Sequence, residues 1–237
     1  MSRATPEHIG QSYPRATGYA IYSEDTKRRT KRNPLLGLFP DLPQSKFDII
    51  YADPPWHYNG KLQFDKSSRD AESIDLSSPI FISSSSFKYP TLKTNDLMKI
   101  PVGNIAKDDC LLFMWTTNPH LAQAIALGHS WGFEYKTVAF VWDKSSHNPG
   151  QYTLSNCELC LLFKRGRIPR PRGARNIQQL IRSPRRAHSQ KPAEVMLSIE
   201  KMFPTQARIE LFARSRAIGW SAWGLEVWDE GNSQVSG

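Results

Sequence analysis

The chain has 237 residues, 39% of them hydrophobic and 11% aromatic, so it can bury one full core without disulfides or structural metals. No apolar run approaches the ~20 residues of a membrane helix, and the first residues lack the apolar core of a signal peptide, which argues against a membrane protein and a secreted one. Three cysteines, an odd number, fit a reducing compartment such as the cytoplasm, and the formal charge of +9 indicates a polyanionic partner, most simply nucleic acid.

The N-terminal residues 1–34 are polar and include a small basic run, Lys27–Arg32. We interpret them as a flexible arm and consider contact with DNA. We assign residues 35–229 to a single domain and residues 230–237 to a tail.

Short apolar runs recur from Lys46 onward. Runs this short and this continuously apolar are typical of strands buried on both faces, as in a parallel sheet. The strands that we expect are Phe47–Ala52, Asp109–Trp115, Thr137–Trp142, Cys157–Phe163 and Ala207–Phe212.

Helical signals lie between these runs. Asn118 and Pro119 form a good N-cap and N1 pair and predict a helix through about Ser130. A second helix starts at Lys191 and ends before Pro204. Strands that alternate with helices predict a single Rossmann-like α/β domain with a mostly parallel, doubly wound sheet. In such sheets ligands bind beyond the carboxyl ends of the strands.

Directly after the first expected strand comes Asp53-Pro54-Pro55-Trp56. Two prolines donate no backbone hydrogen bonds, so carbonyl acceptors dominate there, Asp53 adds a carboxylate and Trp56 a flat ring. Acceptors beside an aromatic plane suit a planar base with an exocyclic amino group. The alternative is a rigid turn whose tryptophan fills the core. At the carboxyl end of the first strand we favour the functional interpretation.

This tetrapeptide resembles the DPPW catalytic motif of the MT-A70-like family of adenine-N6 methyltransferases. The likeness spans about Phe47 to Trp228, and bacterial and bacteriophage members resemble the chain more than eukaryotic RNA enzymes do. Other segments that carry it are YPTL, LLFMWTTNPHL, TVAFVW, NCELCLLFKRG, HSQKP and RIELFARSRAIGWSAWGLEV. The catalytic motif precedes the cofactor strand, which is a permuted order for a class I methyltransferase.

The resemblance implies transfer of a methyl group from S-adenosylmethionine to N6 of adenine. Asp53 and the Pro54 carbonyl region would accept hydrogens of the amino group, and Trp56 would stack on an adenine flipped out of the duplex. Pro55 belongs to the same catalytic motif, and Tyr58 is assigned to the substrate side.

The C-terminal motifs would bind the cofactor, together with Asp53. Lys191 matches the family lysine that pairs with the methionyl carboxylate, and alternation predicts that Leu211 faces away from Glu210 and Phe212. Ala213 replaces a frequent glycine, and Leu225 replaces the usual asparagine, which removes one expected ribose contact. The remaining cofactor residues implied by the resemblance are Ser189, Glu210, Phe212, Arg214 and Glu226.

Between Lys164 and Arg186 there are 9 basic residues and no acidic one, and the rest of the chain holds 22 of each sign. We predict that this segment is a loop that flanks the active-site face and clamps DNA through phosphates. The alternative is a solubility loop. The candidate DNA contacts are Lys164, Arg165, Arg167, Arg170, Arg172, Arg175, Arg185 and Arg186.

Three further features allow alternatives. The serine-rich segment 67–87 is either a recognition loop or lid, or a disordered insertion. Cys157 and Cys160 lie in an apolar run without a second ligand pair, and the histidines are not spaced as metal ligands, so we predict no metal site. His57 and His120 are expected to make local hydrogen bonds.

The sequence therefore predicts a DNA adenine-N6 methyltransferase that acts on double-stranded DNA as a monomer or homodimer. A short palindrome such as GATC is only a guess at its site. The alternatives are an RNA adenine-N6 methyltransferase and a catalytically inactive subunit that binds nucleic acid.

Overall fold

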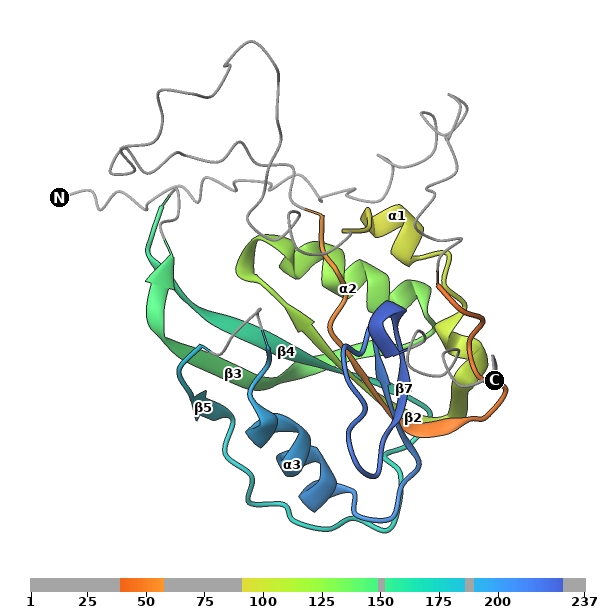
Figure 1. Ribbon diagram of the computed structural model, residues 1–237. Helices are drawn as coiled ribbons and strands as arrows, with labels where there is room; N and C mark the ends of the chain where they lie inside the picture. The colour runs from red at the N-terminus through yellow and green to blue at the C-terminus, as the bar shows by residue number, and fades with distance from the viewer. Residues whose placement is uncertain (1–38, 58–90, 149–151, 186–189, 228–237) are drawn as a thin grey trace, which may run out of the picture. The chain divides into compact units, whose positions relative to one another are not determined.

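The computed structural model describes residues 39–57, 91–148, 152–185 and 190–227 (Figure 1). The chain divides into two units, Met1–Asn33 and Pro34–Gly237, and every described residue belongs to the second. The predicted arm and tail, the serine-rich segment, and the candidate residues Tyr58, Arg186 and Ser189 lie outside the described residues.

The strands of the described part form one mixed, seven-stranded sheet in the order β5-β3-β4-β2-β1-β6-β7. The pairs β1–β2, β1–β6, β6–β7 and β3–β5 are parallel, and β4 is antiparallel to both of its neighbours, β2 and β3. The bounds are β1 (Phe47–Ala52), β2 (Ala106–Thr116), β3 (Glu134–Asn148), β4 (Ser155–Arg165), β5 (Leu180–Arg182), β6 (Arg208–Leu211) and β7 (Ser221–Trp223).

Helices cover both faces of the sheet. The helices α1 (Thr94–Leu97) and α2 (Leu121–Ser130) pack on one face, and α3 (Ala193–Met202) packs on the other (Figure 1). The 3-10 turns η4 (Val102–Ile105) and η5 (Asn118–His120) lead into β2 and α2. No helix of the described residues is long and apolar enough to cross a membrane.

Alternation along the central strands explains why they are apolar throughout. In β1, Ile50 joins the core cluster under α2, whereas its neighbours Ile49 and Tyr51 join the cluster under α3. Successive side chains of a strand point to opposite faces, so a strand covered on both faces needs an apolar residue at every position.

All five predicted strands and both predicted helices are present, and the doubly wound α/β fold is confirmed. The sequence missed β5, β7 and α1, which have three or four residues and are too short to show a period. The cap prediction was wrong by one residue. Thr117 occupies the N-cap of η5, and Asn118 Nδ2 instead donates to Cys157 Sγ at 3.7 Å.

Gly128 allows α2 to approach the sheet. A Cβ at this position would overlap the buried Phe163 ring on β4. We therefore expect Gly128→Ala to lower the free energy of unfolding by about 1–3 kcal/mol in urea titrations, because the extra methyl overpacks the core. The matched change Ala126→Ser, on the exposed side of the same helix, should stay within about 0.5 kcal/mol of the wild type. Equal stability of Gly128→Ala and wild type would contradict this packing.

Candidate active site

An ion pair joins the loop after β1 to the start of α3 at the carboxyl edge of the sheet. Lys191 Nζ lies 2.8 Å from Asp53 Oδ2 and 3.3 Å from Glu158 Oε2 on β4. The same ammonium group lies 5.7 Å from the centre of the Trp115 ring, a cation–π contact. The motif aspartate and the motif lysine, 138 positions apart in the sequence, therefore meet.

Glu158 also contacts a second lysine. Lys144 Nζ on β3, with a side chain that is 4% exposed, lies 3.4 Å from Glu158 Oε1. Burial alone would raise the pKa of Glu158, but Lys191 and Lys144 outweigh it and hold the pKa below its usual value. Burial alone would lower the pKa of Lys191, but Asp53 and Glu158 outweigh it and raise the pKa. Lysine and carboxylate side chains thus alternate along the chain of contacts Lys144, Glu158, Lys191, Asp53.

Sequence reasoning missed Glu158 and Lys144. The available signal was a glutamate inside the apolar run NCELCLLF, since a buried carboxylate needs a cationic partner. The partner lies on a different strand, which the sequence alone does not pair with β4.

The two prolines and Trp56 form a tightly supported loop. Trp56 N donates to the Pro54 carbonyl at 2.8 Å, and Leu92 N donates to the Pro55 carbonyl at 2.8 Å. Trp56 Nε1 donates to the Trp115 carbonyl at 3.2 Å. Each of these two carbonyls thus accepts one hydrogen bond within the fold and has a second lone pair for a further donor.

The Trp56 ring is 6% exposed and stacks on His120, with ring centres 5.5 Å apart. Because Trp56 is almost fully buried, stacking on a flipped adenine, as the resemblance implies, would require its surroundings to open. His120 contacts Thr117 and the His57 carbonyl, and His57 Nδ1 lies 2.9 Å from Thr91 Oγ1, so both histidines make the predicted local hydrogen bonds. Burial lowers the pKa of His120, which favours its neutral form.

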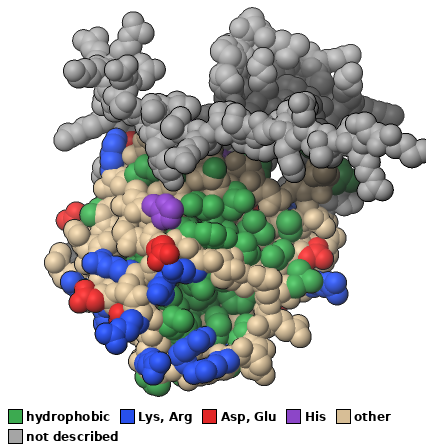
Figure 2. Space-filling model, turned by 180° about the vertical axis from the view of Figure 1, so that it is seen from behind, with side chains coloured by type: hydrophobic (Ala, Val, Ile, Leu, Met, Phe, Trp, Pro, Cys, Tyr) green, Lys and Arg blue, Asp and Glu red, His purple; other side chains and the backbone are tan. Residues whose placement is uncertain are grey.

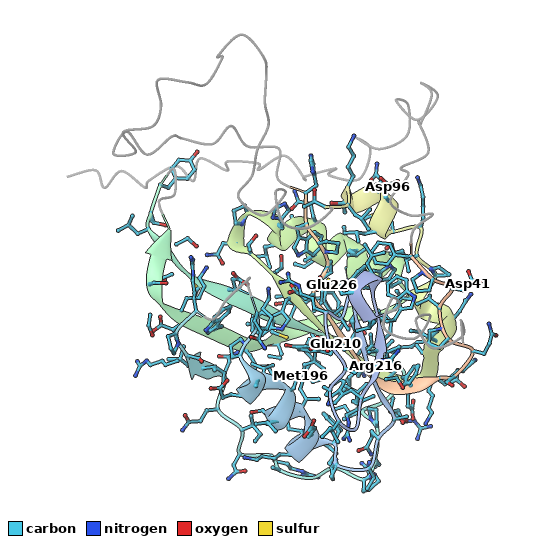
Figure 3. All side chains as sticks on the ribbon, in the orientation of Figure 1. Asp41, Asp96, Met196, Glu210, Arg216 and Glu226 are labelled. Carbon is cyan, nitrogen blue, oxygen red and sulfur yellow. The ribbon has the colours of Figure 1, made fainter. Side chains whose placement is uncertain are left out.

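Glu210 (Figure 3) lies on β6, which pairs with β1, and it interacts electrostatically with Asp53. Burial, followed by the charge of Asp53, raises the pKa of Glu210 to about 7, although Arg214 acts in the opposite direction. Near neutral pH Glu210 is therefore divided between a form that donates and accepts hydrogen bonds and a form that only accepts.

Phe212 departs from strand alternation. Its φ of 62° is in the left-handed region, which is uncommon for a residue with a side chain. Its ring packs against Phe39 and Trp223, in the same core cluster as Leu211. The prediction that Phe212 shares a side with Glu210 was wrong, because the backbone leaves the extended conformation directly after β6. Such backbone strain is found most often at functional sites.

The segment after β7 lies against the segment after β6. A Cβ at Gly224 would overlap the Ala213 carbonyl, and Ala213 N donates to the Trp223 carbonyl at 3.0 Å. Close contact of two backbones therefore requires glycine at 224. Glu226 follows two residues later and is exposed, and Leu225 is half-buried.

The basic segment does not lie where we predicted. Because β4 is antiparallel, Arg165 pairs with Cys110 near the amino end of β2, at the edge opposite Asp53, and its guanidinium donates to the Gly103 carbonyl at 2.8 Å. The prediction that the segment 164–186 flanks the active-site edge was therefore wrong for its first part, which leaves β4 at the opposite edge. The chain returns to the carboxyl edge in β5, where Arg182 pairs with Asp143, followed by Arg185.

A mostly parallel sheet with charged and aromatic groups beyond its carboxyl edge is the architecture of a Rossmann-like methyltransferase. A family model described as MT-A70 matches residues 47–226, and the chain belongs to the MT-A70 family.

Three relatives illustrate the range of similarity. The Type II methyltransferase M.MunI from Mycoplasma sp is 57% identical over 91% of this chain and 92% of its own length. Mouse N(6)-adenine-specific methyltransferase METTL4 is 28% identical over 76% of this chain and 37% of its own length. The human N(6)-adenosine-methyltransferase catalytic subunit METTL3 is 25% identical over 77% of this chain and 28% of its own length. The predicted family, with greater similarity to a bacterial member, is confirmed.

The raised pKa of Glu210 predicts a pH dependence of stability. The unfolded glutamate loses its proton near pH 4.5, whereas the folded one keeps it to about pH 7, so raising the pH from about 5 to about 8 destabilises the fold, by at most about 3 kcal/mol. Urea titrations should show the wild type losing stability over this range relative to Glu210→Gln, which cannot ionise. The exposed control Glu226→Gln should keep the wild-type profile. If the stability of the wild type and of Glu210→Gln depends on pH in the same way, the pKa of Glu210 is not raised.

Proposed function

We propose that the protein is a site-specific DNA methyltransferase that transfers the methyl group of S-adenosylmethionine to N6 of adenine, in the cytoplasm of a bacterial or phage-infected cell. The observation that carries the proposal is the 2.8 Å contact between Asp53 and Lys191 beyond the carboxyl end of β1. Membership of the MT-A70 family supports the reaction, and the match to a bacterial Type II methyltransferase over nearly its whole length supports DNA as the substrate.

Asp53 and Pro54 are suited to hold the adenine amino group. Lys191 fixes Oδ2 of Asp53, so that Oδ1 can accept one amino hydrogen, while the Pro54 carbonyl can accept the other. These two acceptors turn the nitrogen lone pair toward the incoming methyl group. With S-adenosylmethionine bound, the C–N bond would form as the S–C bond breaks, and the extra proton would leave N6 for water.

The donor set fits the cofactor. When bound, S-adenosylmethionine supplies an electrophilic methyl group, so positioning and charge account for most of the catalysis and no strong base is needed. Lys191 has three N–H donors, of which Asp53 and Glu158 take two, and the third suits a methionyl carboxylate. Glu210 is suited to accept from ribose hydroxyl groups, with Phe212 and Arg214 in the segment that follows β6. Ser189 and Glu226 retain the assignments that the family resemblance implies.

Replacement of Asp53 should stop methyl transfer. We expect Asp53→Ala to lower transfer of tritiated methyl groups from S-adenosylmethionine to duplex DNA by at least about 100-fold, because the variant has no carboxylate to accept a hydrogen of the reacting amine. Circular dichroism and the thermal midpoint report whether the variant folds, and Asp41→Ala, exposed and outside the site, is the matched control.

Two other results would change the assignment. Methyl transfer by the wild type to RNA but not to DNA would make the protein an RNA methyltransferase. Nucleic-acid binding without turnover or cofactor binding would make it an inactive subunit.

The cations at the carboxyl edge should contribute more to DNA binding than those at the opposite edge. We expect Arg182→Ser/Arg185→Ser to weaken binding and to flatten the plot of log K against log salt by about 0.9 for each phosphate that the variant no longer neutralises. The control is the quadruple serine variant of Arg167, Arg170, Arg172 and Arg175, which should leave the slope unchanged. If instead the quadruple variant flattens the slope and the double variant does not, DNA binds through Arg167, Arg170, Arg172 and Arg175, as the sequence predicted.

A further inference from the structure

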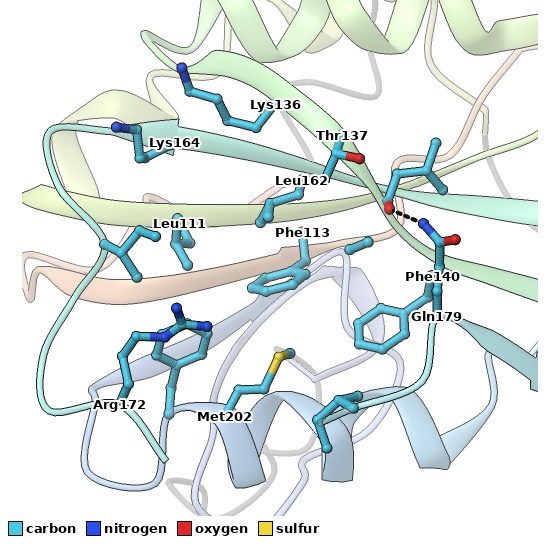
Figure 4. A pocket seen from close by; sticks show the side chains of 15 residues that line it. Leu111, Phe113, Lys136, Thr137, Phe140, Leu162, Lys164, Arg172, Gln179 and Met202 are labelled. Carbon is cyan, nitrogen blue, oxygen red and sulfur yellow. Dashed lines mark hydrogen bonds between the residues drawn. The ribbon is translucent and has the colours of Figure 1, made fainter. Parts of the chain in front are cut away.

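A cavity lies away from the candidate active site. It has a volume of about 550 Å³ and lies on the face of the sheet that α3 partly covers (Figure 4). Its floor is formed by Leu111 and Phe113 of β2, Phe140 of β3 and Leu162 of β4, and the end of α3 contributes Met202. A volume of this size with a predominantly apolar lining is typical of a binding site.

The connection from β4 to β5 creates this cavity. Residues 166–179, the strap, cross the face without forming a helix. The strap is fixed at its start, where Arg167 N donates to Asp109 Oδ1 at 2.7 Å, and at its end, where Val141 N donates to the Gln179 carbonyl at 2.9 Å.

The middle of the strap is fixed as well. Gly173 N and Ala174 N donate to the last turn of α3, at 2.9 and 2.8 Å. A Cβ at Gly173 would overlap the Lys201 carbonyl, so only glycine allows this approach. Because three points hold the strap, the cavity beneath it is a built feature of the fold.

Cations surround the opening. Lys136, Lys164 and Arg172 line the cavity, and Figure 2 shows Lys and Arg side chains beside and below an apolar surface on this face. The nearby acidic groups are already engaged, since Glu134 pairs with Lys136 at 2.5 Å and Asp109 accepts the strap backbone. Ile168 and Leu180, 41% and 46% exposed, add apolar surface on the strap and on the adjoining edge strand.

An apolar floor surrounded by cations fits one kind of ligand best. DNA would satisfy the cations but not the apolar floor, and the cavity lies near the edge opposite Asp53. A second copy docked through the same face would bring cations against cations. We propose that the cavity is a docking site for an acidic segment of a partner protein, whose apolar side chains enter the floor and whose carboxylates meet Lys164 and Arg172.

A synthetic peptide of alternating leucine and glutamate is the probe. Fluorescence anisotropy with the full chain should show saturable binding, weakened at least about 10-fold by Lys164→Glu/Arg172→Glu. The double variant Lys46→Glu/Lys93→Glu changes the net charge equally at exposed sites outside the cavity and should bind as the wild type does. Ala139→Phe, which places a ring in the cavity, should also weaken binding, and thermal midpoints check the folding of each variant.

Each alternative occupant has its own signature. If a serine–glutamate peptide binds as tightly as the leucine–glutamate probe, the site recognises charge alone, and the proposal is overturned. Displacement of the probe by duplex DNA, with the same dependence on Lys164 and Arg172, would make this a DNA surface. Self-association that disappears in the Lys164→Glu/Arg172→Glu variant would make it an interface between copies of the chain. Absence of saturable binding would also reject the proposal.

Discussion

The pairing of buried charge at Lys191 is the constraint on which the rest of the site depends. Removing ions from water costs several kcal/mol each, so buried charges persist only where opposite charges and hydrogen bonds compensate them. Here two lysines and two carboxylates alternate, and each comes from a different part of the fold. Correct placement of Asp53 therefore requires that β1, β3, β4 and the start of α3 are all assembled. At the neighbouring Glu210, burial and the charge of Asp53 outweigh the opposite charge of Arg214, so the pKa of Glu210 rises.

The sequence predicted the parts of the fold that follow from composition within one segment. The run FDIIYA is apolar at almost every position and marks β1 without error, and DPPW marks the turn that follows it. The Asp53–Lys191 meeting was predictable only because the family motif includes both residues. Lys144 and Glu158 belong to no such motif. Their contact requires that β3 and β4 are neighbours, and apolar patterning does not specify which strands are neighbours.

Strand direction limited the prediction of the basic segment. Patterning identifies β4 as a strand but does not tell whether it is parallel or antiparallel, and that direction decides at which edge the next residues emerge. The cations of residues 164–175 would flank the active-site edge with one direction and lie at the opposite edge with the other. Phe212 illustrates the equivalent limit at a single residue, since one left-handed φ moves its ring to the opposite face.

The position of β1 between β2 and β6 also has a consequence for synthesis of the chain. Its residues pair with Arg208–Leu211, and Asp48 Oδ2 accepts from Ala207 N at 2.9 Å across 159 positions of sequence. A ribosome that has completed β1 through β5 has therefore made a sheet in which β1 still exposes one unpaired edge. Such an edge invites pairing with other chains. The strand that carries Asp53 is one of the earliest to be made, yet it gains its second neighbour only when β6, near the end of the chain, has emerged.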